Sequence, residues 1–179
     1  MRYISRHYTN LQDWQVENQK SIRRFQNGTL SEKEMENLAN LIMRIINKSN
    51  STREWVITYI PASTNKKYEK RYFTLTGYLR KHIDVPVAYF GICIKEECDE
   101  YSRHGKKAVA DGNLYIKPHL LKVKNRNVIL IDDNITTGRT LRTVGDFLID
   151  KGAWSVMGVI YSMTIHPRLP YNKKYKRIW

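Results

Sequence analysis

The chain has 179 residues, 41% of them hydrophobic, a length that fits one domain with a sizeable core. No apolar run approaches the length of a membrane span, and residues 1–7 lack the apolar stretch of a secretory signal. The two cysteines, Cys93 and Cys98, have a spacing that suits neither a Cys-x-x-Cys motif nor a four-ligand zinc site. Composition therefore predicts a cytoplasmic, reduced globular protein and argues against a membrane or disulfide-rich one.

The balance of charge is strongly basic. Thirty-one Lys and Arg residues against 17 Asp and Glu residues give a net charge of +14. Such a surface is typical either of a protein with a small anionic substrate or of one that contacts nucleic acid. No aromatic-interleaved recognition motif is present in the sequence, which favours the small substrate and leaves nucleic acid as the alternative partner.

Residues 1–52 predict two helices and carry no recognisable chemistry. The first runs from about Leu11 and stops at Gly28. The second opens with a capping box of Ser31 and Glu34, followed by a stripe expected to be buried: Leu38, Leu41, Ile42, Ile45 and Ile46. We expect this pair to form an extension or hood on one domain that spans 1–179.

The core, residues 53–165, alternates strands and helices. A β-branched strand over 55–60 ends in Pro61 and leads through a polar loop to a helix from about 68 to 82. Further strands are expected over 85–94 and over 154–161. Residues 95–119 are then charged and without periodicity, and a connection this long inside a compact domain is usually functional or mobile.

The most informative stretch is 127–140. Four apolar residues, 128–131, are too few for a helix and suit a buried parallel strand. Asp132 and Asp133 follow, and then a threonine- and glycine-rich turn opens a helix expected over 139–151. Gly138 allows the backbone to approach an anion, and amide groups at a helix N-terminus favour phosphate. The acidic pair suits vicinal sugar hydroxyls or water on a magnesium ion. The stretch therefore predicts a sugar-phosphate site.

This arrangement closely resembles the phosphoribosyl pyrophosphate signature of the type I phosphoribosyltransferases: an apolar run, two acids, two residues and Thr-Thr-Gly-x-Thr. One departure is Asn134, where the family usually has an apolar residue. The stretch is neither a P-loop nor a Gly-x-Gly-x-x-Gly loop. The resemblance implies an α/β fold with a mostly parallel central sheet flanked by helices. It also implies an enzyme that binds magnesium–phosphoribosyl pyrophosphate and transfers ribose 5-phosphate to a nitrogen acceptor, releasing pyrophosphate.

The resemblance also assigns roles to residues. The acids Asp132 and Asp133 would hold the ribose hydroxyls, and the 5′-phosphate would bind at Thr136, Thr137, Gly138, Arg139 and Thr140. Pyrophosphate would meet the loop after the first core strand and its helix, at Ser63, Thr64, Asn65, Lys66, Lys67 and Arg71. A closing flexible loop would supply Arg103, Lys106 and Lys107. Mg²⁺ would be held through substrate and waters, without an assigned direct protein ligand.

The resemblance leaves open the subgroup of the family, the acceptor, the catalytic activity and the oligomeric state. The layout is most similar to ComF-like proteins, although Arg71-Tyr72-Phe73-Thr74 keeps only the Arg and Phe of that group's Arg-Gly-Phe-Asn, and its zinc-binding cysteines are absent. Thr136 stands where hypoxanthine-type enzymes place an Asp that meets the purine, which argues against that specificity and leaves orotate-like, adenine-like or unidentified acceptors. The alternative function is a non-catalytic regulator or nucleic-acid binder on the same fold, using the basic tail 166–179. The resemblance is also compatible with a homodimer.

Overall fold

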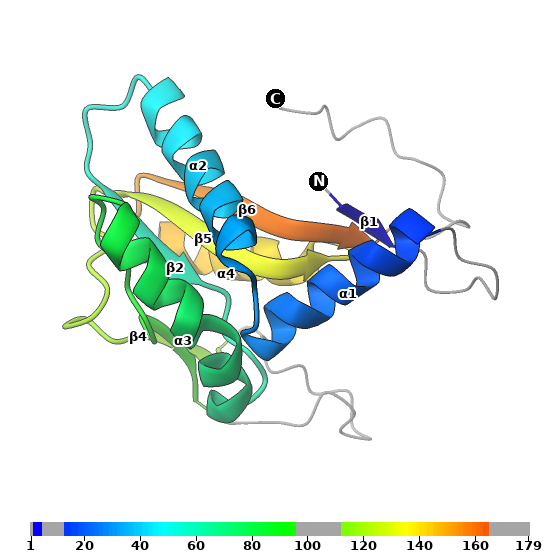
Figure 1. Cartoon of the computed structure of the whole chain (residues 1–179). Coiled ribbons are helices and arrows are strands. Elements are labelled where there is room, and N and C mark those ends of the chain that lie inside the picture. The colour runs from blue at the N-terminus through cyan, green and yellow to red at the C-terminus, as the bar shows by residue number, and fades with distance from the viewer. Residues whose placement is uncertain (1, 5–12, 96–111, 165–179) are drawn as a thin grey trace.

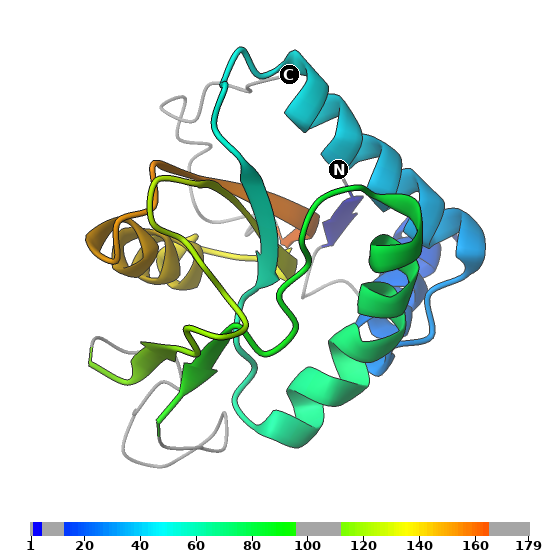
Figure 2. The same ribbon diagram turned by 90° about the vertical axis from the view of Figure 1, so that its left-hand side faces the viewer.

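The structure is a computed structural model that describes residues 2–4, 13–95 and 112–164. Within these residues one sheet has four parallel strands in the order β1-β6-β5-β2, with bounds Arg2–Ile4, Ser155–Thr164, Asn127–Ile135 and Trp55–Tyr59. Helix α4 (Arg139–Asp150) covers one face of the sheet (Figures 1 and 2). The other face is covered by α1 (Asp13–Asn27), α2 (Glu32–Lys48) and α3 (Asn65–His82). The expected α/β class with a parallel sheet is confirmed.

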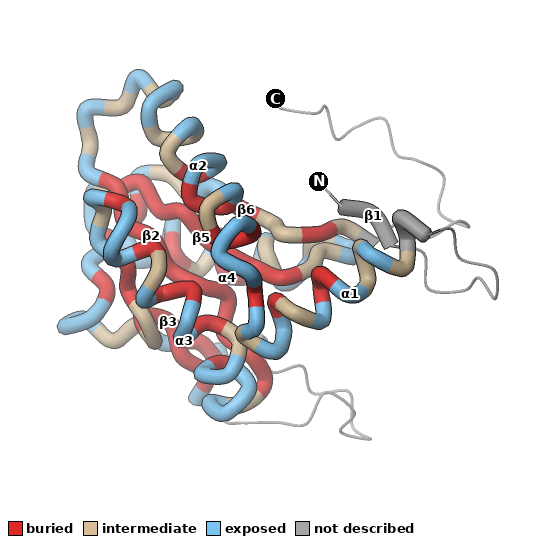
Figure 3. Tube along the Cα trace, in the orientation of Figure 1, coloured by how far each residue is buried: buried red, intermediate tan, exposed pale blue. Residues whose placement is uncertain are grey.

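Strand β5 lies at the centre of the two cores. Val128 and Leu130 pack on the α4 side, while Ile129 and Ile131 pack on the side of the other three helices. Since the strand is covered on both faces, it needs an uninterrupted apolar run rather than an alternating pattern. Figure 3 shows the resulting buried centre, with helix surfaces exposed around it.

The two N-terminal helices pack directly on this core. α1 ends before Gly28, whose φ is +68°, and a Cβ at Gly28 would lie 2.0 Å from the carbonyl oxygen of Lys70 in α3. The predicted capping box of α2 is present. Leu38 and Ile42 are buried as expected, but Leu41 is 41% exposed, so that part of the predicted stripe is wrong. Adjacent residues differ by about 100° around a helix, which turns Leu41 away from the face that buries Ile42.

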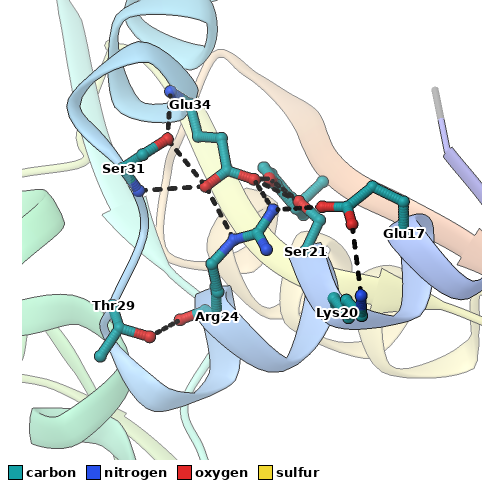
Figure 4. A network of polar contacts seen from close by, with 8 residues as sticks. Glu17, Lys20, Ser21, Arg24, Thr29, Ser31 and Glu34 are labelled. Atoms are coloured by element: carbon teal, nitrogen blue, oxygen red, sulfur yellow. Dashed lines mark hydrogen bonds and ion pairs between the residues drawn. The ribbon is translucent and has the colours of Figure 1, made fainter.

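A buried carboxylate joins these helices to the sheet (Figure 4). Glu34 of α2 accepts hydrogen bonds from Arg24 and Ser21 of α1, from Tyr161 of β6 and from the backbone of Ser31. Burial alone would raise the pKa of Glu34, but these hydrogen bonds outweigh it and hold the pKa well below its ordinary value. The charged form of Glu34 therefore stabilises the contact between α1, α2 and β6.

We predict that Glu34→Gln lowers the free energy of unfolding by about 2–4 kcal/mol near neutral pH, because Arg24 and Tyr161 lose a charged acceptor. A depressed carboxyl pKa stabilises the fold above the unfolded-state pKa and is lost as pH falls toward the folded-state value. The difference between the two melting temperatures should therefore be largest at pH 6–7 and shrink below about pH 4. Thermal unfolding at several pH values checks this. The exposed carboxyl of Glu32 in the same helix, changed by Glu32→Gln, is the control.

Three expected elements differ in extent. The predicted strand 85–94 is wrong as one element: Val87 alone bridges to Ile57 of β2, and β3 (Ile92–Ile94) pairs antiparallel with β4 (Leu114–Ile116) in a separate sheet. Phe90 interrupts it, with φ of +55° and its amide donated to the Tyr68 hydroxyl. α3 begins three residues earlier than about 68, after its cap at Thr64, and β6 continues beyond 161 to Thr164.

Among the described helices none is long and apolar enough to cross a bilayer.

Candidate functional site

The carboxyl ends of β2 and β5 meet at one edge of the sheet. The strands are parallel and in register, with Tyr59 opposite Ile131, and the amide of Ile60 donates to the carbonyl of Ile131 at 2.9 Å. The loop after β2 therefore begins beside Asp132. Open α/β sheets bind ligands at this edge, outside the carboxyl ends of their strands.

Asp132 and Asp133 lie inside β5, as its sixth and seventh residues, rather than after it. Both are buried, and β5 continues through Asn134 to Ile135 in register with β6. The Asp133 amide donates to Asp132 Oδ1 at 2.9 Å. Asp133 itself accepts from Arg71 Nη1 at 3.1 Å and from Gln26 Nε2 at 2.6 Å, one on each carboxylate oxygen. Residues of α1, α3 and β5 thus converge on one carboxylate.

The carboxylates of Asp132 and Asp133 have different surroundings. Burial, and then the neighbouring charge of Asp133, raise the pKa of Asp132 well above its ordinary value, against a smaller opposing effect of Arg71. Asp133 has the guanidinium of Arg71 as its ion-pair partner. A ligand that offers hydroxyl donors or a cation to this pair would therefore stabilise the charged form of Asp132.

The expected phosphate turn lies between β5 and α4. Gly138 is the N-cap of α4 in the left-handed conformation, with φ of +75°, and no side chain caps the helix there. Thr136, Thr137, Arg139 and Thr140 are exposed. The first turn of α4 contains no acidic residue. The Arg139 amide donates to the Thr137 hydroxyl at 3.4 Å. The other amide groups of the first turn, together with the helix dipole, suit an anion.

The loop after β2 is more internally bonded than the sequence indicates. The Thr64 hydroxyl caps α3 by accepting the Lys67 amide at 3.2 Å, and Lys67 Nζ donates to the buried Ser63 hydroxyl at 3.1 Å. Asn65 and Lys66 are exposed in the first turn of α3. Arg71, grouped with this loop on sequence grounds, lies instead against Asp133. The structure therefore brings Arg71 to the acidic pair.

Two residues at the site were missed by sequence reasoning. Gln26 is an exposed residue near the end of α1, and nothing in its sequence context marks it. Ser162 of β6 is fully buried, with its hydroxyl 3.0 Å from the carbonyl oxygen of Asp133 and 2.9 Å from Oδ1 of Asn134. A serine opposite Asn134 explains how β5 accommodates a polar residue there. Arg103, Lys106 and Lys107 lie outside the described residues.

The family of the chain follows from a comparison with protein-family models. The model of the phosphoribosyl transferase domain matches residues 42–178. The chain therefore belongs to the phosphoribosyl transferase family, whose enzymes are pentosyltransferases. The resemblance of the motif at 127–140 to this family is confirmed.

The chain is also similar to individual proteins of known sequence or structure. A bifunctional protein PyrR of Actinobacillus succinogenes is 27% identical over 145 residues, which cover 79% of this chain and 76% of the relative. A ribose-phosphate pyrophosphokinase of Methanopyrus kandleri is 36% identical over 73 residues, covering 41% of this chain and 24% of the relative. Among solved structures, a hypoxanthine phosphoribosyltransferase from Staphylococcus aureus is similar with a TM-score of 0.46 and 16% identity, over 78% of this chain and 77% of the other.

We predict opposite effects of neutralising the two acids on stability. Asp132→Asn removes a buried charge that repels Asp133 and should raise the free energy of unfolding by about 0.5–2 kcal/mol at pH 7. Asp133→Asn leaves the Arg71 guanidinium, which is 15% exposed, without its carboxylate and should lower it by about 2–4 kcal/mol.

Thermal unfolding of both variants measures these changes, and a pH series tests their cause. Because the folded-state pKa of Asp132 is raised, its charge destabilises the fold at high pH, and this effect is relieved as pH falls through that pKa. The gain from Asp132→Asn should therefore shrink on acidification. A loss of stability for Asp132→Asn equal to that of Asp133→Asn would contradict the assignment.

Proposed function

We propose that the carboxyl edge of β5 and β2 is the site for phosphoribosyl pyrophosphate, and that the chain transfers its ribose 5-phosphate unit to a nitrogen acceptor. The observation that carries this proposal is the position of the acidic pair. Asp132 and Asp133 follow the apolar part of β5, and residues 136–138 then lead into α4, which begins at Arg139. One side of the site thus accepts hydroxyl donors, and the other offers donors to phosphate.

Each part of the donor has a matching group. The 2′ and 3′ hydroxyls would donate to Asp132 and Asp133, and the 5′-phosphate would lie on the amides and hydroxyls of 136–140. Pyrophosphate would meet the first turn of α3, where Asn65, Lys66 and Lys67 have exposed side chains and the first turn contains no acid. The loop bearing these residues starts beside the acidic pair, as the bond between Ile60 and Ile131 shows.

Magnesium fits this site only as a partner of the substrate. No cluster of three or more His, Cys, Asp or Glu side chains that could hold a metal occurs in the part of the chain that the structure describes. Mg²⁺ commonly keeps several waters and binds one or two carboxylates together with substrate phosphates, and Asp132 and Asp133 suit that arrangement. When bound, the ion would neutralise charge on the pyrophosphate.

The reaction breaks the bond from the anomeric carbon of ribose to the pyrophosphate oxygen and forms a bond from that carbon to the acceptor nitrogen. Pyrophosphate leaves with the bonding electron pair, and the acceptor loses a proton. Positive charge develops on the ribose ring, so carboxylates held beneath the 2′ and 3′ hydroxyls stabilise the transition state. The side chains of this site would act mainly by position and charge.

Arg71 and Gln26 suit a positioning role in this scheme. Together they contact both oxygens of Asp133 and leave Asp132 without either partner. Because each carboxylate oxygen has two lone pairs, a ribose hydroxyl can join these bonds rather than replace them. Gln26 also places α1 at the rim of the site, so the predicted hood and the acceptor region would meet there. We expect a nucleobase or similar heterocycle as acceptor.

Calorimetric titration with phosphoribosyl pyrophosphate and Mg²⁺ tests the donor site. We predict micromolar binding to the wild type and at least a 100-fold loss in Asp132→Asn/Asp133→Asn, because two hydroxyl acceptors lose their charge. Asp146→Asn, an exposed residue of α4, makes the same chemical change outside the site and should bind normally. Circular dichroism of the double variant separates lost binding from lost folding.

The outcome also separates the two functions considered from sequence. Binding that depends on the acidic pair would justify a screen for pyrophosphate release with adenine, hypoxanthine, guanine, uracil and orotate. Absence of binding in the folded wild type would contradict the proposal. Nucleic-acid binding, suggested by the charge of +14, would then be the function to measure, as a function of salt.

A further inference from the structure

A hollow lies at the edge of the sheet opposite the candidate donor site. It has a volume of about 480 Å³ and is formed by β4, the segment 117–126 that leads into β5, and the end of α4. In Figure 2 this segment runs from the small sheet toward the start of β5. Asn125, with φ of +59°, turns the chain there, and its amide donates to the carbonyl of Gly152 at 2.8 Å. The hollow is thus bounded by backbone that is bonded to the end of α4.

The rim of this hollow is cationic. Lys122, Lys124, Arg126 and Lys151 line it, and no acidic residue does. Among the residues that the structure describes, Lys122, Lys124 and Lys151 form no ion pair, and Arg126 pairs with Glu54, whose side chain is 73% exposed. Four cations around one concavity repel one another, and an anion between them removes that repulsion.

The floor of the hollow is apolar. The buried Leu121 and Val123 alternate along the chain with the exposed Lys122 and Lys124. Ile116, which is half-buried, and Pro118, which is exposed, also line the hollow. A volume of this size falls in the range of small-molecule sites, which combine apolar lining with a few placed polar groups. The lining therefore suits a ligand with an anionic group and a flat or apolar part.

This place is separate from the proposed donor site. Arg126 precedes the first residue of β5 and Lys151 follows the last residue of α4, whereas the acidic pair and Gly138 lie at the other ends of the same elements. Twelve helical residues span about 18 Å, so one mononucleotide cannot occupy both places.

We propose that the groove of Lys122, Lys124, Arg126 and Lys151 is a second binding site, for a nucleoside phosphate whose phosphates meet the cations and whose base lies on the apolar floor. Its existence does not depend on the proposed transferase activity.

The test is a calorimetric titration of AMP, ADP and inorganic phosphate into full-length protein and into Lys122→Ala/Lys124→Ala. We expect the wild type to bind ADP more tightly than phosphate, since only ADP reaches the floor, and the double variant to bind ADP at least 10-fold more weakly. Lys48→Ala/Lys81→Ala removes the same charge from exposed ends of α2 and α3 and should change ADP affinity less than two-fold.

A second variant distinguishes the two sites, because nucleotides also carry phosphate that suits the turn 136–140. Asp132→Asn/Asp133→Asn should keep ADP binding while losing phosphoribosyl pyrophosphate. The proposal is overturned if this variant abolishes ADP binding, if both lysine pairs weaken it equally, or if ADP binds no better than phosphate. Failure of the donor proposal would appear only in the phosphoribosyl pyrophosphate titration, so the two failures are distinguishable.

Discussion

Two adjacent carboxylates at the end of a buried strand are costly, because burial and mutual repulsion both disfavour their charged forms. The fold offsets this cost mainly for Asp133, through the hydrogen bonds that Arg71 of α3 and Gln26 of α1 donate to it. Asp132 is left with the Asp133 amide and a raised pKa. A ligand that brings hydrogen-bond donors to Asp132 would therefore stabilise its charged form, which the protein alone stabilises poorly. Stability and ligand binding are opposed at this residue.

The N-terminal helices take part in this balance. α1 forms hydrogen bonds to the sheet through Ser21, at the Tyr161 hydroxyl of the Glu34 network, and through Gln26, at Asp133. Because Gly28 has no Cβ, the chain can pack directly against the backbone of α3 at Lys70. The same helix is held at the Glu34 carboxylate and at the candidate site. A shift of α1 would therefore change the hydrogen bond from Gln26 to Asp133. This makes α1 a wall of the site as well as a cover for the sheet.

The main features of the site could be predicted from sequence because they depend on local patterns. The run 128–131, the acidic pair and Gly138 follow one another along the chain. The strand, the two buried charges and the start of the next helix could therefore be predicted from one continuous stretch. The partners of Asp133 were not, since Gln26 and Arg71 reach it only through tertiary packing. Likewise 85–94 has the composition of a strand, but the bond from Phe90 to Tyr68 turns the chain out of the sheet. Leu41 was misplaced because an apolar stripe does not show how wide the buried face is.

The order of the strands has a consequence for how the chain is made. β5 pairs with β2, which precedes it by some 70 residues, and with β6, which follows it, while β1 at Arg2–Ile4 pairs with the last residues of β6. Pairings between distant segments form slowly, and a ribosome delivers the N-terminal partner first. β1 therefore has no partner until residues 162–164, which lie 160 positions later in the chain, have been made. During that time the apolar faces of α1, α2 and α3 have no completed sheet to pack on, and they stay exposed while the chain emerges.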